Sequence, residues 1–194
     1  MSRAFGHPRL LVTGFGPFPG VPENPTEVLV RAIAESPPPG VTAACLDTHW
    51  NVGRELTRLA QGMDGVLMFG VAARAHRIRY ERFAHPVAGA MEDASGETPT
   101  AAPLRFRHTG FDVPRLVQAA RRRGFPVTAS DSAGAYICNA GYGAALAVSR
   151  AALFVHVPLA RPRGPLSAAG LRLHADWLID HLRAVIDRRR PGLR

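Results

Sequence analysis

Two side chains far apart in the sequence, Cys138 and His156, could together hydrolyse an acyl group. Cys138 lies in SAGAYICNA, where residues 132–134 indicate a turn and the residues after the cysteine begin a helical pattern. The positive end of a helix dipole favours the thiolate, the nucleophilic form of cysteine, and unpaired N–H groups there could bind an oxyanion. The setting favours a nucleophile, against the alternative that Cys138 is a small packing residue.

The apolar segment ALFVHVP places His156 near the carboxyl end of a predicted strand, because Pro158 and a loop-like segment follow. A buried imidazole needs a partner, since an unsatisfied polar group costs about 1–3 kcal/mol. A lone histidine in a strand is commonly a structural residue. Ligands of open α/β sheets bind at the carboxyl ends of the strands, however, so His156 is also a candidate base.

A Cys–His pair usually needs a third group that orients the imidazole. Three carboxylates occur near predicted strand ends, and spacing alone does not choose among Asp47, Glu81 and Asp131. Glu81 is the strongest candidate because it interrupts RYERFA, whose other residues fit an ordinary strand pattern. Its structural alternative is a surface ion pair with Arg79 or Arg82, worth less than about 1 kcal/mol.

The segment TGFGPFPG, residues 13–20, follows a predicted strand and resembles a phosphate-binding loop only superficially. Pro19 stands where a dinucleotide-binding loop needs its third glycine, and Pro17 and Pro19 remove two backbone donors. We therefore exclude a phosphate cradle. The rigid loop presents Phe15 and Phe18, which either pack into the core or form a wall for a flat apolar ligand.

The elements that must position these residues alternate between strand and helix patterns along the chain. Apolar or alternating runs predict strands at residues 10–13, 41–47, 65–70, 77–84, 125–131 and 152–158. Helical spacing with stop signals predicts helices at residues 25–36, 52–61, 113–124, 139–150 and 166–190. This order predicts an α/β fold: one domain, residues 1–194, with a twisted, largely parallel central sheet flanked by helices. Residues 85–105 are too long for an ordinary connection and suggest a binding loop or an oligomer arm.

Composition excludes several classes of protein. The chain has 194 residues, 46% hydrophobic and 20% charged, which is typical of a globular protein that folds alone or as an oligomer. Its two cysteines and the absence of a Cys/His cluster argue against a disulfide framework and structural zinc, so a reducing cytoplasm is expected. No leader is expected at the N-terminus, and no run approaches the roughly 20 apolar residues of a membrane span.

The net charge of +9 comes from arginine alone, because the chain contains no lysine. Basic clusters at residues 121–123 and 188–190 could touch phosphates. Both clusters fall at predicted helix C-termini, where cations favour the dipole, so solvated helix ends are the better interpretation. A nucleic-acid-binding domain is the weakest alternative, since the chain has no basic patch interleaved with aromatic residues.

Four segments, TGFGPFPG with ENPT, GVAARAHRIRYERFA, SDSAGAYICNAGY and LFVHVP, occur in the order and approximate spacing of the pyroglutamyl peptidase I family, the C15 cysteine peptidases. The chain resembles that family over most of its length. The resemblance implies an α/β/α fold around a mixed sheet. It also implies a cytoplasmic enzyme without cofactor or metal, often a homo-oligomer (dimer or tetramer), that removes N-terminal 5-oxoproline from peptides.

The resemblance also implies roles for individual residues. Cys138 would be the nucleophile, His156 the general base and later the acid, and Glu81 the residue that orients His156. Six positions would line or adjoin the pocket for the lactam ring: Phe15, Phe18, Asn24, Val71, Tyr136 and Ile137. An apolar slot suits pyroglutamate, which lacks the free α-amine that ordinary aminopeptidases bind.

Three positions depart from the family pattern. Pro86 replaces an asparagine common in the family, Met91 stands near an arginine of bacterial members, and Val71 replaces a glutamine that varies. Losing a polar contact with the substrate amide costs about 1–3 kcal/mol of binding. The alternative function is therefore a diverged cysteine hydrolase with the same triad, acting on another small N-acyl or lactam group.

Overall fold

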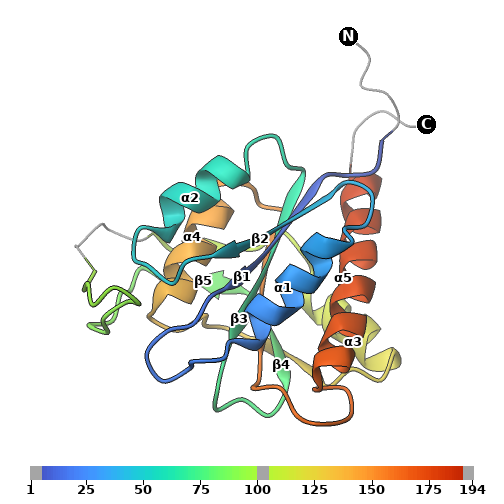
Figure 1. Ribbon diagram of the computed structural model, residues 1–194. Coiled ribbons are helices and arrows are strands. Elements are labelled where there is room, and N and C mark those ends of the chain that lie inside the picture. The colour runs from blue at the N-terminus through green and yellow to red at the C-terminus, as the bar shows by residue number, and fades with distance from the viewer. Residues whose placement is uncertain (1–5, 100–104, 190–194) are drawn as a thin grey trace.

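The computed structural model describes residues 6–99 and 105–189 (Figure 1). Its strands are β1 (Leu10–Phe15), β2 (Val41–Leu46), β3 (Gly65–Val71), β4 (Ile78–Glu81), β5 (Phe83–Ala84), β6 (Arg107–His108), β7 (Val127–Ser130) and β8 (Ala152–Val157). Its helices are α1 (Pro25–Glu35), α2 (Val52–Leu59), α3 (Val113–Arg122), α4 (Ile137–Val148) and α5 (Ala168–Arg188). The predicted α/β class is confirmed.

Six strands form one mixed sheet in the order β2-β1-β3-β8-β4-β7. The four strands from β2 to β8 are parallel, whereas β4 lies antiparallel to β8 and parallel to β7. The carboxyl ends of β1, β3 and β8 therefore meet at one edge of the sheet, where open α/β sheets bind ligands. The antiparallel entry of β4 brings its last residue, Glu81, opposite Phe154 of β8.

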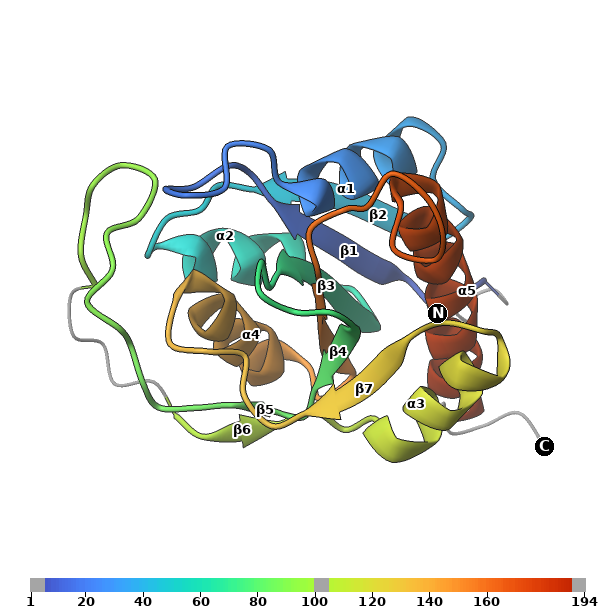
Figure 2. The same cartoon turned by 90° about the horizontal axis from the view of Figure 1, so that it is seen from below.

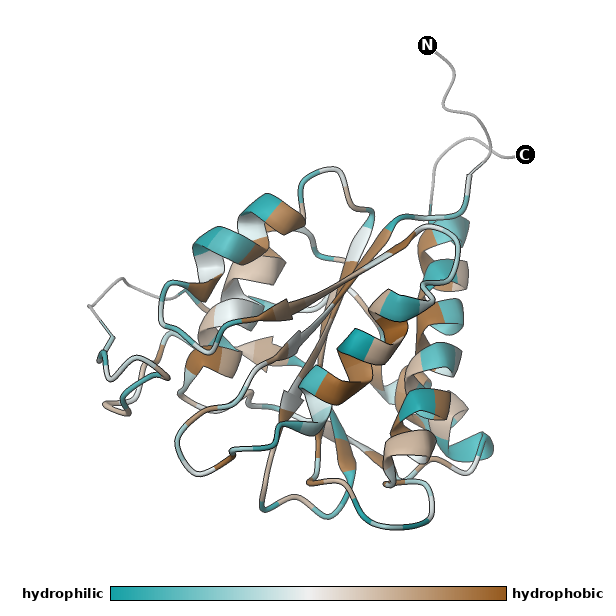
Figure 3. Ribbon diagram, viewed as in Figure 1, coloured by the Kyte–Doolittle hydropathy of each residue, from teal (hydrophilic) through white to brown (hydrophobic). Residues whose placement is uncertain are grey.

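Helices cover both faces of the sheet (Figures 1 and 2). On one face α2 and α4 cover a core that includes Met68 and Phe154 from alternate strand positions and Tyr142 of α4 itself. On the other face α1, α3 and α5 cover the intervening residues, such as Leu67 and Val155. β1, β3 and β8 are buried along their whole length, and the outer surfaces of α1 and α5 are polar (Figure 3). Because successive strand residues point to opposite faces of the sheet, the position of a residue along its strand decides which of the two cores its side chain enters.

The predicted strand at residues 77–84 is divided in the structure. β4 ends at Glu81, and β5 leaves the main sheet to form a two-stranded antiparallel ribbon with β6. Arg82, at the break, forms an ion pair with Asp131 at the end of β7, which holds the turn of the chain. The prediction of one continuous strand was therefore wrong at this residue.

The long predicted loop contains no helix or strand over residues 85–99, which lie along the outer side of α2 and α4 (Figure 2). Residues 100–104 of that loop lie outside the described part of the chain. Among the helices that the structure describes, none combines the length and the apolar character needed to cross a bilayer.

Candidate active site

Glu81 and His156 are hydrogen-bonded neighbours on adjacent strands. His156 Nδ1 lies 2.8 Å from Glu81 Oε1, and both side chains point from the α2/α4 face of the sheet. Glu81 is 0% exposed and His156 is almost completely buried. Because Nδ1 is occupied by the carboxylate, Nε2 of the imidazole is left for another partner.

Cys138 approaches this pair from the first turn of α4. The helix begins at Ile137, and its N-cap residue, Tyr136, makes no side-chain capping bond. Asn139 N and Ala140 N donate to the carbonyl of Tyr136, so the N–H groups of Ile137 and Cys138 form the positive end of the helix dipole beside the Cys138 side chain. The predicted position of Cys138 at a helix N-terminus is confirmed.

Gly70 of β3 makes room for the sulfur. It is paired with His156 of β8, and a Cβ atom on Gly70 would lie 3.1 Å from Cys138 Sγ and 2.6 Å from the ring of Phe154. Any side chain at this position would displace buried groups. The sulfur therefore sits over the edge of the sheet where β3 and β8 carry Gly70 and His156.

The electrostatic environment links the three side chains. Burial alone would lower the pKa of His156, but the hydrogen-bonding contacts with Cys138 and Glu81 outweigh it and raise that pKa to about 9. Two groups that can carry a negative charge, the Cys138 thiol and the Glu81 carboxyl, thus favour the charged imidazolium. This arrangement can supply a nucleophile and a proton donor near neutral pH.

The other two candidate carboxylates do not join the pair. Asp131 is exposed and bound to Arg82. Asp47 is exposed at the start of the connection between β2 and α2. Glu81 makes no surface ion pair of the kind considered as its structural alternative, because it is buried against His156.

Aromatic rings form a wall around the N-terminus of α4. The Phe18 and Tyr136 ring centroids lie 5.8 Å apart, and the Tyr136 and Trp50 centroids lie 5.4 Å apart with the rings edge to face. Burial, followed by the nearby charges of Asp93 and Cys138, raises the pKa of Tyr136. We refer to Phe18, Tyr136 and Trp50 as the aromatic wall. Of these three rings, Tyr136 is the one whose hydroxyl interacts electrostatically with Cys138.

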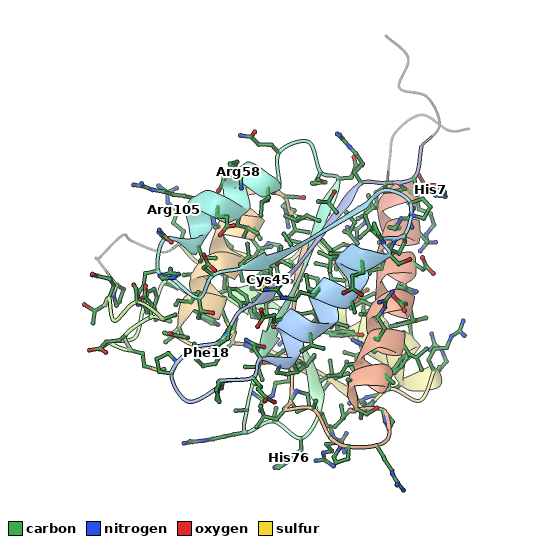
Figure 4. The ribbon with its side chains drawn as sticks, in the orientation of Figure 1. His7, Phe18, Cys45, Arg58, His76 and Arg105 are labelled. Atoms are coloured by element: carbon green, nitrogen blue, oxygen red, sulfur yellow. The ribbon has the colours of Figure 1, made fainter. Side chains whose placement is uncertain are left out.

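The two loop phenylalanines have different environments. Phe15 is 2% exposed and packs against Phe154 beneath the site, whereas Phe18 is half-buried in the outer turn (Figure 4). Phe18 and Val21 exchange backbone hydrogen bonds across Pro19 and Gly20. Gly20 has a φ of 84°, which a tight turn with proline at its first central position requires. Phe15 therefore packs into the core, whereas Phe18 remains a candidate for the wall of a ligand site.

The remaining predicted site residues are held by local contacts. Asn24 caps α1, where its Oδ1 accepts from Thr26 N and its Nδ2 donates to the carbonyl of Gly16. Ile137 is completely buried in the core beneath α4. Val71 follows Gly70, so strand alternation directs it to the opposite face of the sheet from Cys138. These contacts make Asn24 and Ile137 supports of the loop and helix that carry the aromatic wall.

Sequence reasoning missed several residues that shape the site. Asn139, directly after Cys138, accepts from His85 N and donates to the carbonyls of His85 and Val87, which ties that segment to α4. Trp50 and Asp93 were also missed. The sequence signal for Asp93 was the Asp-x-Ser pattern, because an aspartate in a turn often accepts a hydrogen bond from the backbone N–H two residues later.

The fold and the site together define a class of protein. A thiol at a helix N-terminus, an imidazole held by a buried carboxylate and an open α/β sheet are the parts of a cysteine hydrolase. The profile of the family described as pyroglutamyl peptidase, Peptidase C15, matches residues 8–161. This chain belongs to the pyroglutamyl peptidase family.

Relatives and solved structures agree with that assignment. The pyrrolidone-carboxylate peptidase of Halalkalibacterium halodurans is 34% identical over 142 residues, covering 67% of this chain and 70% of the relative. That of Streptomyces coelicolor is 30% identical over 174 residues, covering 81% of each chain. The crystal structure of pyrrolidone carboxyl peptidase from Thermus thermophilus superimposes with a TM-score of 0.78 at 25% identity, covering 89% of this chain and 99% of that one.

Proposed function

We propose that this protein is a cysteine peptidase that removes N-terminal pyroglutamate from peptides through Cys138, His156 and Glu81. The observation that carries the proposal is the 2.8 Å bond between Glu81 and His156, with Cys138 approaching the same imidazole from the N-terminus of α4. Membership of the pyroglutamyl peptidase family supports the substrate class.

In the proposed reaction the Cys138 thiolate attacks the carbonyl carbon that follows the lactam ring, and the C=O π electrons move to oxygen. The first-turn N–H groups of α4 are oriented to stabilise that oxyanion. When the intermediate collapses, the C–N bond breaks and His156 gives its proton to the departing amine. A thioester to Cys138 remains, bound to the pyroglutamyl group.

Water completes the cycle with the same groups. The imidazole, now neutral, takes a proton from water while the oxygen attacks the thioester carbon. The C–S bond then breaks, which releases pyroglutamate and returns the thiolate–imidazolium pair. Glu81 holds Nδ1 of His156 through both steps, so Nε2 stays directed toward the reacting atoms.

The aromatic wall supports recognition of a neutral ring. Phe18, Tyr136 and Trp50 offer aromatic surface beside Cys138, and none of them carries a charge that would bind an α-ammonium group. A flat lactam stacks on such rings, while its N–H and C=O require only a few polar groups. The nearby carboxylate of Asp93 is buried and already accepts hydrogen bonds from its own segment and from Trp50 N, so a free N-terminal amine would be desolvated there without a carboxylate to bind.

The test compares fluorogenic amides of pyroglutamate, glutamate, glutamine and proline. We expect the pyroglutamyl amide to be hydrolysed with a kcat/KM at least about 10³-fold above the others, because a polar group that is buried unpaired is strongly rejected. Cys138→Ala should abolish the activity. Turnover of the pyroglutamyl amide no faster than the rest would favour the diverged hydrolase suggested by Pro86, Met91 and Val71.

We also propose that the protein assembles as a homo-oligomer in the cytoplasm. Both cysteines are free, which fits a reducing compartment. Val28 and Leu159 are exposed along a groove of about 500 Å³ between α1 and the N-terminus of α5, and such surfaces favour association. Size-exclusion chromatography with light scattering measures the molar mass of the eluted protein and so distinguishes monomer, dimer and tetramer.

A further inference from the structure

Residues 89–97 bridge the two loops that carry Trp50 and Tyr136 of the aromatic wall. At one end Gly89 N donates to the carbonyl of Ala135, directly before Tyr136. Further along, Ala94 N donates to the carbonyl of Thr48 at 3.0 Å, two residues before Trp50. The segment thus joins the β2–α2 connection to the start of α4, although these lie about ninety residues apart in the sequence.

Two carbonyls of this segment hold rings of the aromatic wall. Trp50 Nε1 donates to the carbonyl of Met91 at 3.1 Å, and the Tyr136 hydroxyl donates to the carbonyl of Glu92 at 2.9 Å. Both acceptors are backbone atoms, and the Met91 side chain itself is 51% exposed. The orientation of the rings therefore depends on where the backbone of residues 91–92 lies.

The next residue, Asp93, fixes that backbone. Its Oδ1 accepts from Ser95 N at 2.8 Å, Ser95 Oγ at 2.7 Å and Glu97 N at 3.0 Å, which folds the segment upon itself. Its Oδ2 accepts from Trp50 N at 3.0 Å, which joins the segment to the β2–α2 connection. Asp93 is 3% exposed, so water does not replace these donors.

The charge of Asp93 suits this set of partners. Burial pushes the pKa of Asp93 upward, but the hydrogen bonds from Ser95, from Trp50 N and from Glu97 N outweigh it and hold that pKa well below its ordinary value. His49 Nδ1, 3.6 Å from Oδ2, is the nearest titratable nitrogen. Only a carboxylate accepts on both oxygens at once, because an amide replaces one acceptor by a donor.

We propose that Asp93 is a positioning residue of the substrate site. Its carboxylate fastens residues 89–97 to the backbone of Trp50, and the carbonyls of Met91 and Glu92 then hold Trp50 and Tyr136 in the wall against which the lactam ring lies. The proposal rests on the proposed function for the identity of the ligand. It assigns Asp93 no contact with the reacting atoms and no effect on the thiolate.

The test uses Asp93→Asn, with Glu97→Gln as the matched control. The control removes a negative charge from the same segment but keeps the backbone N–H that binds Asp93. For Asp93→Asn we expect KM for the pyroglutamyl amide to rise about tenfold or more, the equivalent of one lost hydrogen bond to a charged group, while kcat changes less than about threefold. Glu97→Gln should match the parent in both constants.

Two further measurements do not depend on turnover. In a Trp177→Phe background Trp50 is the only tryptophan, and acrylamide should quench its fluorescence more strongly after Asp93→Asn. The rate at which iodoacetamide alkylates Cys138 should stay within about twofold of the parent, because the nucleophile is unchanged. Greater quenching together with an inactive parent would support the positioning role and reject the proposed substrate.

Two results with Asp93→Asn, and one with Ser95→Ala, would overturn the proposal. The first is an unchanged KM with unchanged quenching of Trp50 fluorescence. The second is a loss of kcat matched by slower alkylation of Cys138, which would make Asp93 part of the nucleophile's environment. If Asp93→Asn does not fold, Ser95→Ala decides, because it removes the hydroxyl donor at 2.7 Å, together with that hydroxyl's contact with His49 Nδ1, but keeps the backbone N–H groups that bind Asp93. An increase of about twofold or more in KM at constant kcat then supports the role of Asp93, and an unchanged KM rejects it.

Discussion

Glu81 and His156 face each other through a 2.8 Å hydrogen bond although they belong to strands that run in opposite directions. The antiparallel pairing of β4 with β8 sets their separation, since it places Glu81 opposite Phe154, two residues before His156. A rigid sheet thus fixes the orientation of the imidazole, and α4 only has to deliver the sulfur of Cys138.

The first prediction concerns the pH dependence of catalysis. Because the pKa of His156 is raised to about 9, its imidazolium persists through neutral pH and is lost as the pH rises past that value. In the proposed reaction the imidazolium donates the proton to the leaving amine, so kcat/KM should decline above about pH 9. A rate profile on the pyroglutamyl amide from about pH 7 to about pH 10.5, on both sides of the pKa of His156, measures this limb.

Substitutions of the same pair extend that prediction. Glu81→Gln removes a charge that raises the pKa of His156, so the decline should begin at a lower pH. His156→Ala should lower kcat by about 10²–10⁴-fold, the range of general acid–base catalysis, and Glu81→Gln should cost less. If kcat/KM of Glu81→Gln declines at the same pH as that of the parent, Glu81 does not raise the pKa of His156, and the prediction is wrong.

The two cysteines should differ sharply in reactivity. Cys45 lies on β2 beside α1 (Figure 4), where burial, followed by the charge of Glu27, raises its pKa to about 11. At pH 7.5 its thiolate is then roughly three parts in ten thousand, and the thiolate is the reactive form. Iodoacetamide at limiting concentration should label Cys138 first and abolish activity, as peptide mapping would report. Equal labelling of both thiols would mean that Cys138 is not activated.

A single methyl group at Gly70 should disturb the site. Gly70→Ala places a Cβ atom 2.6 Å from the ring of Phe154, which is completely buried and must shift, and 3.1 Å from Sγ of the half-buried Cys138. We expect a loss of about 1–3 kcal/mol in the free energy of unfolding, with slower alkylation of Cys138. Denaturant unfolding and thiol kinetics measure the two effects.

Gly143→Ala is the matched control for that substitution. The added Cβ would meet only Ala84 Cβ at 3.8 Å, an ordinary contact, in the middle of α4. Alanine favours the helix over glycine by up to about 1 kcal/mol, so this variant should be as stable as the parent or more so. Comparable losses in both variants would show that tight packing around Gly70 has no special importance.

Much of the fold was predictable because its signals are local. Apolar runs and helical spacing located the helices and the strands of the main sheet, and the turn before Cys138 indicated a helix N-terminus. The bend at Arg82 was not predictable, because it depends on Asp131 at the end of another strand.

The site was predictable only in part, for a related reason. Local patterns identified Cys138 and His156, but the choice of Glu81 over Asp47 and Asp131 depends on which strand inserts next to β8, a long-range pairing. The same holds for the aromatic wall. Trp50 and Tyr136 meet through the backbone of residues 91–92, and nothing near either ring in the sequence indicates that contact.

The most direct test of the account uses an affinity label. A pyroglutamyl chloromethyl ketone should alkylate the protein once, on Cys138, and should do so far faster than the prolyl analogue, which carries an amine in place of the lactam amide. Intact mass followed by peptide mapping measures both rate and position, with Cys138→Ser as the unreactive control. Equal rates with the two reagents, or a first adduct on Cys45, would contradict a lactam site built around Cys138.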